Sequence, residues 1–149
     1  MHPMTDRPLS DAEYADLRGF QEAAWAGLPG LARDASPADI VATIGVVAPG
    51  LRELEHDDQV AASIAYGAVW GEQVHRVLGW DWALVSPAGP EDEEFALVSP
   101  GREYRIAPLY LLLPYATGAQ AEDTSALLFN LLCAGQLPAS APNAYLELQ

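Results

Sequence analysis

A chain of 149 residues with 50% hydrophobic content can bury one core of ordinary size, so we expect a single domain over residues 1–149. Its seven basic residues are all arginine and face 21 acidic residues, and the resulting net charge of -14 argues against nucleic acid and anionic membranes as partners. The one cysteine, Cys133, excludes an internal disulfide. With neither a signal-peptide pattern nor an apolar run of about 18 residues, the sequence predicts a cytoplasmic protein.

Two helices are predicted in the first third of the chain. Ser10 and Glu13 have the spacing of a capping box, which predicts a helix that starts beside them and runs to about Leu28. A second helix is predicted after Ser36, because a serine followed by proline at the first helical position is a typical start. A proline–glycine pair at residues 49–50 ends or kinks it.

A third helix over about residues 58–79 has the clearest helical period, with Asp57 or Asp58 as its expected cap. Its apolar stripe consists of Val60, Ile64, Gly67, Gly71, Val74 and Leu78. Glycine inside a helix costs about 0.5–1 kcal/mol relative to alanine, so two glycines one turn apart predict the close approach of a neighbour. We expect the side chains of Trp80 and Trp82 to fill that space.

The period changes to two after Gly79, which predicts strands. Residues 80–85 alternate between large apolar side chains and smaller or polar ones, as in a half-buried strand. Residues 94–99 and 102–108 have the pattern of two further strands. Because only short, turn-rich links join them, we expect a three-stranded antiparallel meander.

The segment 108–116 either extends the third strand or forms a short helix bent by Pro114, and the helix is slightly favoured. A final helix is predicted after Asp123 or Thr124, with Cys133 as a small buried hydrophobe. Its inward side chains are expected to be Leu127, Leu128, Leu131 and Leu132. In the tail, Tyr145 and Leu146 are expected to dock on the domain. The sequence therefore predicts an α+β fold with N-terminal helices, a three-stranded antiparallel meander and a C-terminal helix.

Glu72 and His75 share a helix face, so they raise the possibility of a metal site or an acid–base pair. A zinc-protease helix has a second histidine in the pattern H-E-x-x-H, which is missing here. The simpler interpretation, which we favour, pairs Glu72 with Arg76 one turn later. We found no catalytic loop motif and expect no metal, cofactor or catalytic residue.

Short motifs in the middle of the chain resemble a known family. They are G-x-x-x-G-E at Gly67, Gly71 and Glu72, L-G-x-x-W at Leu78, Gly79 and Trp82, an Ala96–Leu97 pair in the next strand, and a closing Pro108. Over about residues 55–115 this order resembles a bacterial domain family of uncharacterised function that occurs in small stand-alone proteins. The resemblance implies an immunity-type or effector-associated role and supplies no catalytic residues. After Pro108 the chain departs from the family, because an apolar segment replaces the expected basic one.

The leading functional hypothesis is a small acidic binding protein, specifically an immunity-type inhibitor of a basic protein partner. Aromatic side chains that escape burial would anchor the contact. The candidates are Trp25, Tyr66, Trp70 and Tyr110. One alternative is a small-molecule or metal-dependent enzyme that uses Glu72 and His75, with Asp81 or His56 as a further group. The other is a structural subunit that self-associates through its leucine-rich residues 109–132, which leaves open a monomer or a homodimer.

Overall fold

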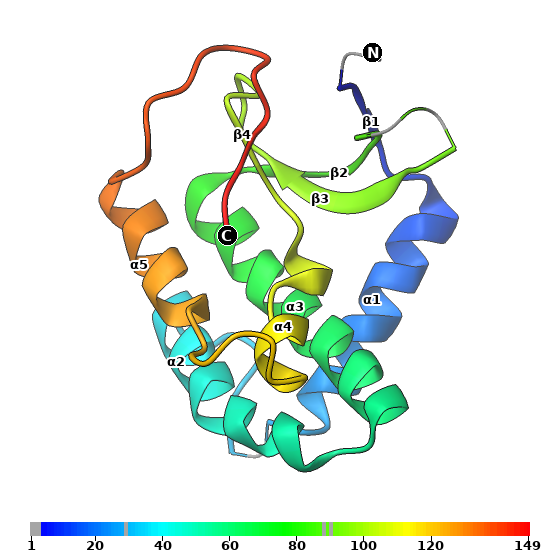
Figure 1. Ribbon diagram of the computed structural model, residues 1–149, viewed down its shortest axis with the longest axis vertical. Helices are drawn as coiled ribbons and strands as arrows, with labels where there is room; N and C mark the ends of the chain where they lie inside the picture. Colours follow the sequence, from blue (N-terminus) through cyan, green and yellow to red (C-terminus); the bar gives the residue numbers. More distant parts are fainter. Residues whose placement is uncertain (1–3, 29, 88, 90) are drawn as a thin grey trace.

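The computed structural model describes residues 4–28, 30–87, 89 and 91–149, and it forms one mixed sheet with helices gathered on one face (Figure 1). The predicted α+β class is confirmed. The helices are α1 (Asp11–Trp25), α2 (Pro37–Val47), α3 (His56–Leu78), α4 (Leu113–Ala116) and α5 (Ser125–Ala134), with the short 3-10 helices η1 (Ala48–Glu53) and η2 (Pro108–Tyr110). The strands are β1 (Asp6–Pro8), β2 (Asp81–Val85), β3 (Glu94–Val98), β4 (Tyr104–Ile106) and β5 (Leu146–Glu147).

The prediction of a three-stranded sheet is wrong, because the described residues form a sheet of five strands in the order β1-β2-β3-β4-β5. The first four are antiparallel neighbours, and the C-terminal β5 adds in parallel to β4. The two additional strands are only three and two residues long, so each carries too short a pattern to be recognised in isolation. Residues 88 and 90 of the predicted turn before β3 lie outside the described residues.

Local capping signals position two of the helices as predicted. The Ser10 hydroxyl accepts a hydrogen bond from the Glu13 backbone amide, and the Ser10 backbone amide donates to the Glu13 carboxylate in return, so the capping box of α1 is complete. Ser36 caps α2 by accepting from the Asp39 amide at 3.1 Å. The predicted cap of α3 is wrong: the cap residue is Glu55, without a side-chain hydrogen bond, and both predicted aspartates lie in the first turn.

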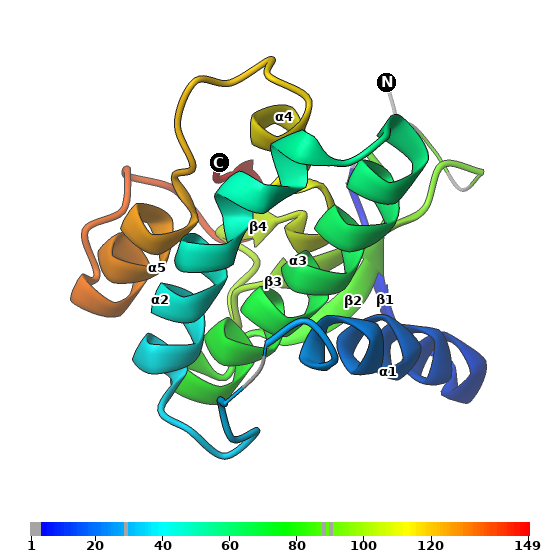
Figure 2. The same cartoon turned by 90° about the horizontal axis from the view of Figure 1, so that it is seen from below.

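The central element of the core is α3, which passes beneath the sheet between α1 on one side and the α2–α5 pair on the other (Figure 2). Its middle section is buried around most of its circumference, beyond the single stripe predicted. Trp70 is completely buried, and its indole Nε1 donates to the Ser125 carbonyl oxygen at 3.1 Å. This hydrogen bond ties α3 to the start of α5 and satisfies the one polar atom of the ring.

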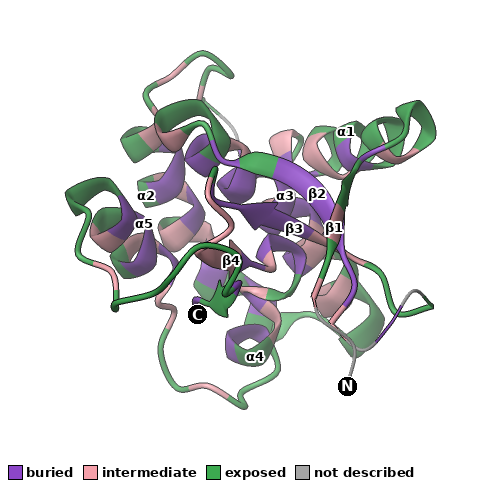
Figure 3. Cartoon of the chain, turned by 90° about the horizontal axis from the view of Figure 1, so that it is seen from above, coloured by how far each residue is buried: buried purple, intermediate pink, exposed green. Residues whose placement is uncertain are grey.

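The second face of the sheet is also buried, which corrects the prediction of a half-buried strand at residues 80–85. The described helices all lie on the other face, as the view from above shows (Figure 3). The outer floor is made of small side chains, and Tyr145 packs over them together with Met4. The floor residues are Ala83, Val85, Ala96 and Val98. The C-terminal segment therefore covers part of the sheet face that the helices do not cover.

A polar network fastens this C-terminal segment to the first strand. The Tyr145 hydroxyl donates to Asp6, and Arg102 donates to both oxygens of the same carboxylate at 3.1–3.2 Å and to Asp81 at 3.0 Å. Burial and the bond to Asp6 raise the pKa of Tyr145 to about 12. Tyr145 and Arg102 both have left-handed backbone conformations, so the turn and the tail are shaped to bring these side chains together.

The C-terminal third agrees with the sequence in part. Residues 108–116 are helical in the form of η2 and α4, as favoured, and Gly135 closes α5 in a left-handed conformation. The expected inward position of Leu127 is wrong, since 58% of this residue is exposed. Cys133 is likewise exposed rather than buried, although partial burial still raises the pKa of its thiol. No helix in the described part of the chain is both long and apolar enough to cross a membrane.

Candidate functional site

The two glycines of α3 are indeed places of close approach, but by two different neighbours. The Trp82 ring packs on Gly71, where an added Cβ would lie 2.6 Å from the ring edge. Gly67 instead accommodates the backbone at Pro108, the start of η2. Trp80, which we expected to share this space, stacks on Tyr104 with ring centroids 6.2 Å apart. The glycine face is therefore scaffold, as predicted, although only one of the two indoles fills it.

Glu72 does not pair with Arg76, which corrects the favoured interpretation. Its Oε2 accepts from the Trp82 indole Nε1 at 3.0 Å and from the Gln21 amide at 3.4 Å. Arg76 binds Gln73 and a backbone carbonyl instead. The packing of β2 against α3 brings the Trp82 indole N–H to the carboxylate, and this donor displaces Arg76 as the partner because a buried indole N–H has to be satisfied.

His75 is oriented by a single short hydrogen bond. Its Nδ1 lies 2.7 Å from the Trp80 carbonyl oxygen, an acceptor, so Nδ1 carries the proton. In the neutral ring Nε2 is then an acceptor. His56 begins α3 while His75 lies in its last turn, about 28 Å away by helical rise, so these two histidines share no site. No group of three metal-binding side chains occurs among the described residues.

The four aromatic candidates differ in how much of each ring is available. Trp70 is completely buried and is no anchor. Tyr66 is half-buried, and its hydroxyl donates to the Gly27 carbonyl at 3.3 Å. Trp25 is half-buried with the Arg33 guanidinium 5.8 Å from its ring centroid. Tyr110 is 52% exposed, so it alone of the four presents most of its ring to solvent.

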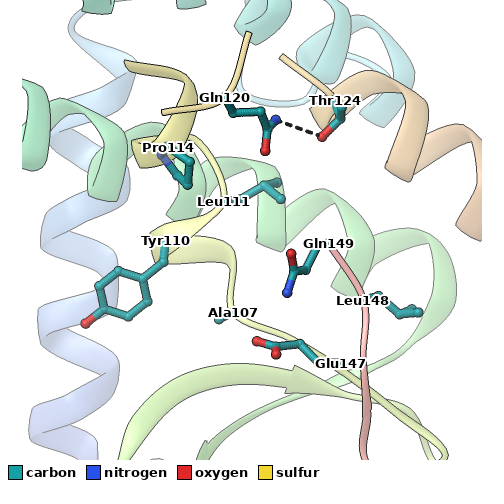
Figure 4. Close-up of a pocket in the computed structure, with 9 residues that line it drawn as sticks. All are labelled: Ala107, Tyr110, Leu111, Pro114, Gln120, Thr124, Glu147, Leu148 and Gln149. Atoms are coloured by element: carbon teal, nitrogen blue, oxygen red, sulfur yellow. Dashed lines mark hydrogen bonds between the residues drawn. The ribbon is translucent and has the colours of Figure 1, made fainter. Parts of the chain in front are cut away.

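Tyr110 stands at the rim of a cavity of about 220 Å³, which we call the Tyr110 cavity (Figure 4). Its ring projects outward, and the Glu147 carboxylate points from β5 toward the same side. Among the lining residues Glu147 has the one charged side chain, and the other side chains are apolar, amide or hydroxyl. The lining residues are Ala107, Tyr110, Leu111, Pro114, Gln120, Thr124, Glu147, Leu148 and Gln149.

The charge at the Tyr110 cavity is negative even though an arginine lies near it. Arg105 is 3.3 Å from Glu147 and 3.7 Å from Glu94, so one guanidinium is shared between two carboxylates. These three side chains sum to one negative charge. Burial raises the pKa of Glu94, while Glu147 keeps much of its side chain exposed.

A second cavity, of about 250 Å³, lies between α1, α3 and β2, and we call it the α1–α3 cavity. It contains Glu72 and His75, two of the residues singled out in the sequence. Two further hollows, of about 280 Å³ and about 90 Å³, share lining residues with it. Its lining residues are Tyr14, Leu17, Arg18, Gln21, Glu72, His75 and Trp82.

Sequence reasoning missed Glu147 and Arg18. Glu147 reaches the Tyr110 cavity because β5 pairs with β4, a contact between distant parts of the chain. The one signal in the sequence that pointed to this contact was the apolar content of the tail, which indicated that the tail docks on the domain. Arg18 lies on the exposed side of an amphipathic helix, where a charged residue is ordinary and carries no functional signal.

Comparisons with protein-family models, with curated proteins and with solved structures found no match. The resemblance over residues 55–115 therefore stays a prediction.

Proposed function

We propose that the protein is a small acidic binding protein that recognises a basic protein partner, as an immunity-type inhibitor does. The observation that carries the proposal is a cavity whose lining includes both the exposed Tyr110 and the Glu147 carboxylate. An aromatic face next to a carboxylate is complementary to a guanidinium or ammonium group. A basic side chain of the partner would lie over Tyr110 and point its charge at Glu147.

The distribution of arginines supports a negative exterior. Four of the seven bind carboxylates within the chain. Arg52 is held by backbone carbonyls and lies over the Tyr115 ring at 4.0 Å. Many acidic side chains therefore stay free, including the exposed run Glu53, Glu55, Asp57 and Asp58, for which no ion pair occurs among the described residues. Such a surface would accelerate the approach of a basic partner, and Tyr110 would fix the contact.

The proposal is tested with a labelled oligo-arginine peptide and fluorescence anisotropy. We expect saturable binding that weakens as salt rises to about 0.15 M, and no binding of an oligo-glutamate peptide. Tyr110→Ala is expected to weaken binding about fivefold, because it removes the cation–π surface. Glu147→Gln is expected to weaken binding and to reduce its dependence on salt.

Tyr14→Ala is the matched control. Tyr14 is also an exposed tyrosine, at 39%, but it lies on α1, and neither tyrosine variant alters the net charge. The nonspecific attraction of the oligo-arginine peptide to the acidic surface is therefore the same in both variants. If Tyr110→Ala and Tyr14→Ala bind the peptide equally well, or if the native protein does not bind it, the proposal is contradicted.

A further inference from the structure

The α1–α3 cavity contains a cation that has no partner in the described part of the chain. Arg18 makes no hydrogen bond or ion pair with any described residue, whereas the other six arginines each have a partner. It lines the cavity from α1. A free guanidinium is suited to a carboxylate, which it binds with two parallel hydrogen bonds.

The opposite wall, on α3, presents acceptors. Both hydrogen bonds to Glu72 go to Oε2, so Oε1 accepts none from the residues that the structure describes. The bond from His75 Nδ1 to the Trp80 carbonyl leaves Nε2 with a lone pair in the neutral ring. Two free acceptors, one of them charged, are complementary to an ammonium group, which has donors only.

Apolar surface lies between these two walls. The buried Leu17 and Trp82 and the exposed Tyr14 are the apolar and aromatic residues that line the cavity, and we call them its aromatic floor. The Trp82 ring is held on Gly71 and by its bond to Glu72, so this floor is fixed in place.

The combination selects one class of ligand. An anion alone would satisfy Arg18 but would face the Glu72 carboxylate. A cation alone would satisfy Glu72 but would face Arg18. A small zwitterion satisfies both, and an apolar substituent on it would cover the aromatic floor. We propose that the α1–α3 cavity binds a free apolar amino acid, with its carboxylate on Arg18, its ammonium group on Glu72 and His75, and its side chain against Trp82 and Tyr14.

The proposal is tested by isothermal titration calorimetry with L-phenylalanine and L-leucine. An open cavity of this size predicts a dissociation constant of about 0.1–1 mM for at least one of them. Removal of either charge from the ligand is expected to weaken binding at least about tenfold, as measured with 3-phenylpropionate and 2-phenylethylamine. Failure of both amino acids to bind at about 10 mM would overturn the proposal, as would equal affinity for the three phenyl compounds.

Two substitutions locate the site on the protein. Arg18→Gln is expected to weaken amino-acid binding about tenfold while leaving the affinity for 2-phenylethylamine unchanged. Arg33→Gln is the matched control, because Arg33 also lies beside α1 but is paired with Glu22 and lines the adjoining hollow. It is expected to bind the amino acid as the native protein does. Equal binding by Arg18→Gln and Arg33→Gln would refute the assignment, and thermal unfolding of each variant establishes that it is folded.

Glu72→Gln tests the role assigned to the α3 wall, because glutamine retains an oxygen that accepts from the Trp82 indole but carries no charge. We expect the preference for the amino acid over 3-phenylpropionate to disappear in this variant. A retained preference would contradict the assigned role of Glu72. The outcome is independent of oligo-arginine binding, so either proposal can fail while the other holds.

Discussion

The indole Nε1 of Trp82 donates to Glu72 Oε2 across 3.0 Å, and this bond joins β2 to α3. Both residues belong to the most aromatic part of the chain, where helical spacing alone favours a different partner for the carboxylate. The bond places Glu72 at the wall of the α1–α3 cavity and holds the Trp82 ring on Gly71. One hydrogen bond therefore serves both the scaffold and the cavity.

Removal of the acceptor is expected to destabilise the fold. Glu72→Ala leaves the buried Trp82 indole without a partner, and we expect a loss of about 1–3 kcal/mol in the free energy of unfolding. Glu72→Gln keeps an oxygen acceptor and is expected to cost less than about 1 kcal/mol. Urea unfolding followed by tryptophan fluorescence measures both. Equal losses in the two variants would mean that the hydrogen bond contributes little.

Substitution of the α3 glycines by alanine is expected to reduce the free energy of unfolding to different degrees. Gly67→Ala would drive a methyl group into the backbone at Pro108, which cannot move independently, so we expect a loss of about 3 kcal/mol or more. Gly71→Ala meets only the edge of the Trp82 ring and is expected to cost about 1–3 kcal/mol.

Gly19→Ala is the control for this series, because Gly19 lies within α1 with open space around it. It is expected to stabilise the protein by about 0.5–1 kcal/mol, the ordinary difference in helix propensity. Chemical denaturation of the three variants gives the ranking, and a stable Gly67→Ala protein would contradict the close approach of η2.

Tyr145 predicts a loss of stability at alkaline pH. Its pKa is raised from 10.0 to about 12 in the folded protein, which therefore holds the phenol proton more tightly than the unfolded chain. The corresponding stabilisation is fully present below pH 10 and is lost as the pH rises from 10 to 12. Tyr145→Phe is expected to be less stable near neutral pH by about 1 kcal/mol and to lose less stability over the alkaline range. Parallel pH profiles for the two proteins would argue against the Tyr145–Asp6 bond.

The Glu13 carboxylate is expected to cause a loss of stability at acidic pH. Its bond to Arg7 is the main reason that its pKa falls from 4.5 to about 2, and the Ser10 amide adds to the effect. The stabilisation from this carboxylate is present above pH 4.5 and is lost as the pH falls toward 2. Glu13→Gln should flatten the stability profile in that range. Titration of the Glu13 carboxyl by NMR gives an independent value, and a midpoint near 4.5 would contradict the pairing seen here.

Local signals predicted much of the fold, while the distant pairings escaped prediction. Ser10, Glu13 and Ser36 announce helix starts because a cap and its target lie within one turn of each other. The strands β1 and β5 depend on neighbours far away in the sequence, so the predicted sheet had three strands instead of five. Leu127 has the apolar side chain of a typical core residue, but the face of α5 on which it lies is turned toward solvent.

The candidate site, like the fold, could be predicted in its local features but not in those that depend on contacts between distant residues. Tyr110 was recognisable from the sequence as an aromatic candidate, yet its exposure depends on how η2 packs against α3. Trp70 was an equally good candidate by type and proved to be completely buried. Glu147 was not predicted because only the docked tail brings it to the cavity.

In the proposed function the basic partner binds at the Tyr110 cavity, while the aromatic-rich residues 66–82 of α3 and β2 hold the fold together and do not contact the partner. An NMR titration of the isotope-labelled protein with the oligo-arginine peptide tests this directly, because it reports every backbone amide. We expect saturable shifts that are largest at Tyr110, Leu111 and Glu147. Shifts concentrated at Tyr14, Arg18 and His75, or spread evenly over all acidic residues, would contradict the proposed function.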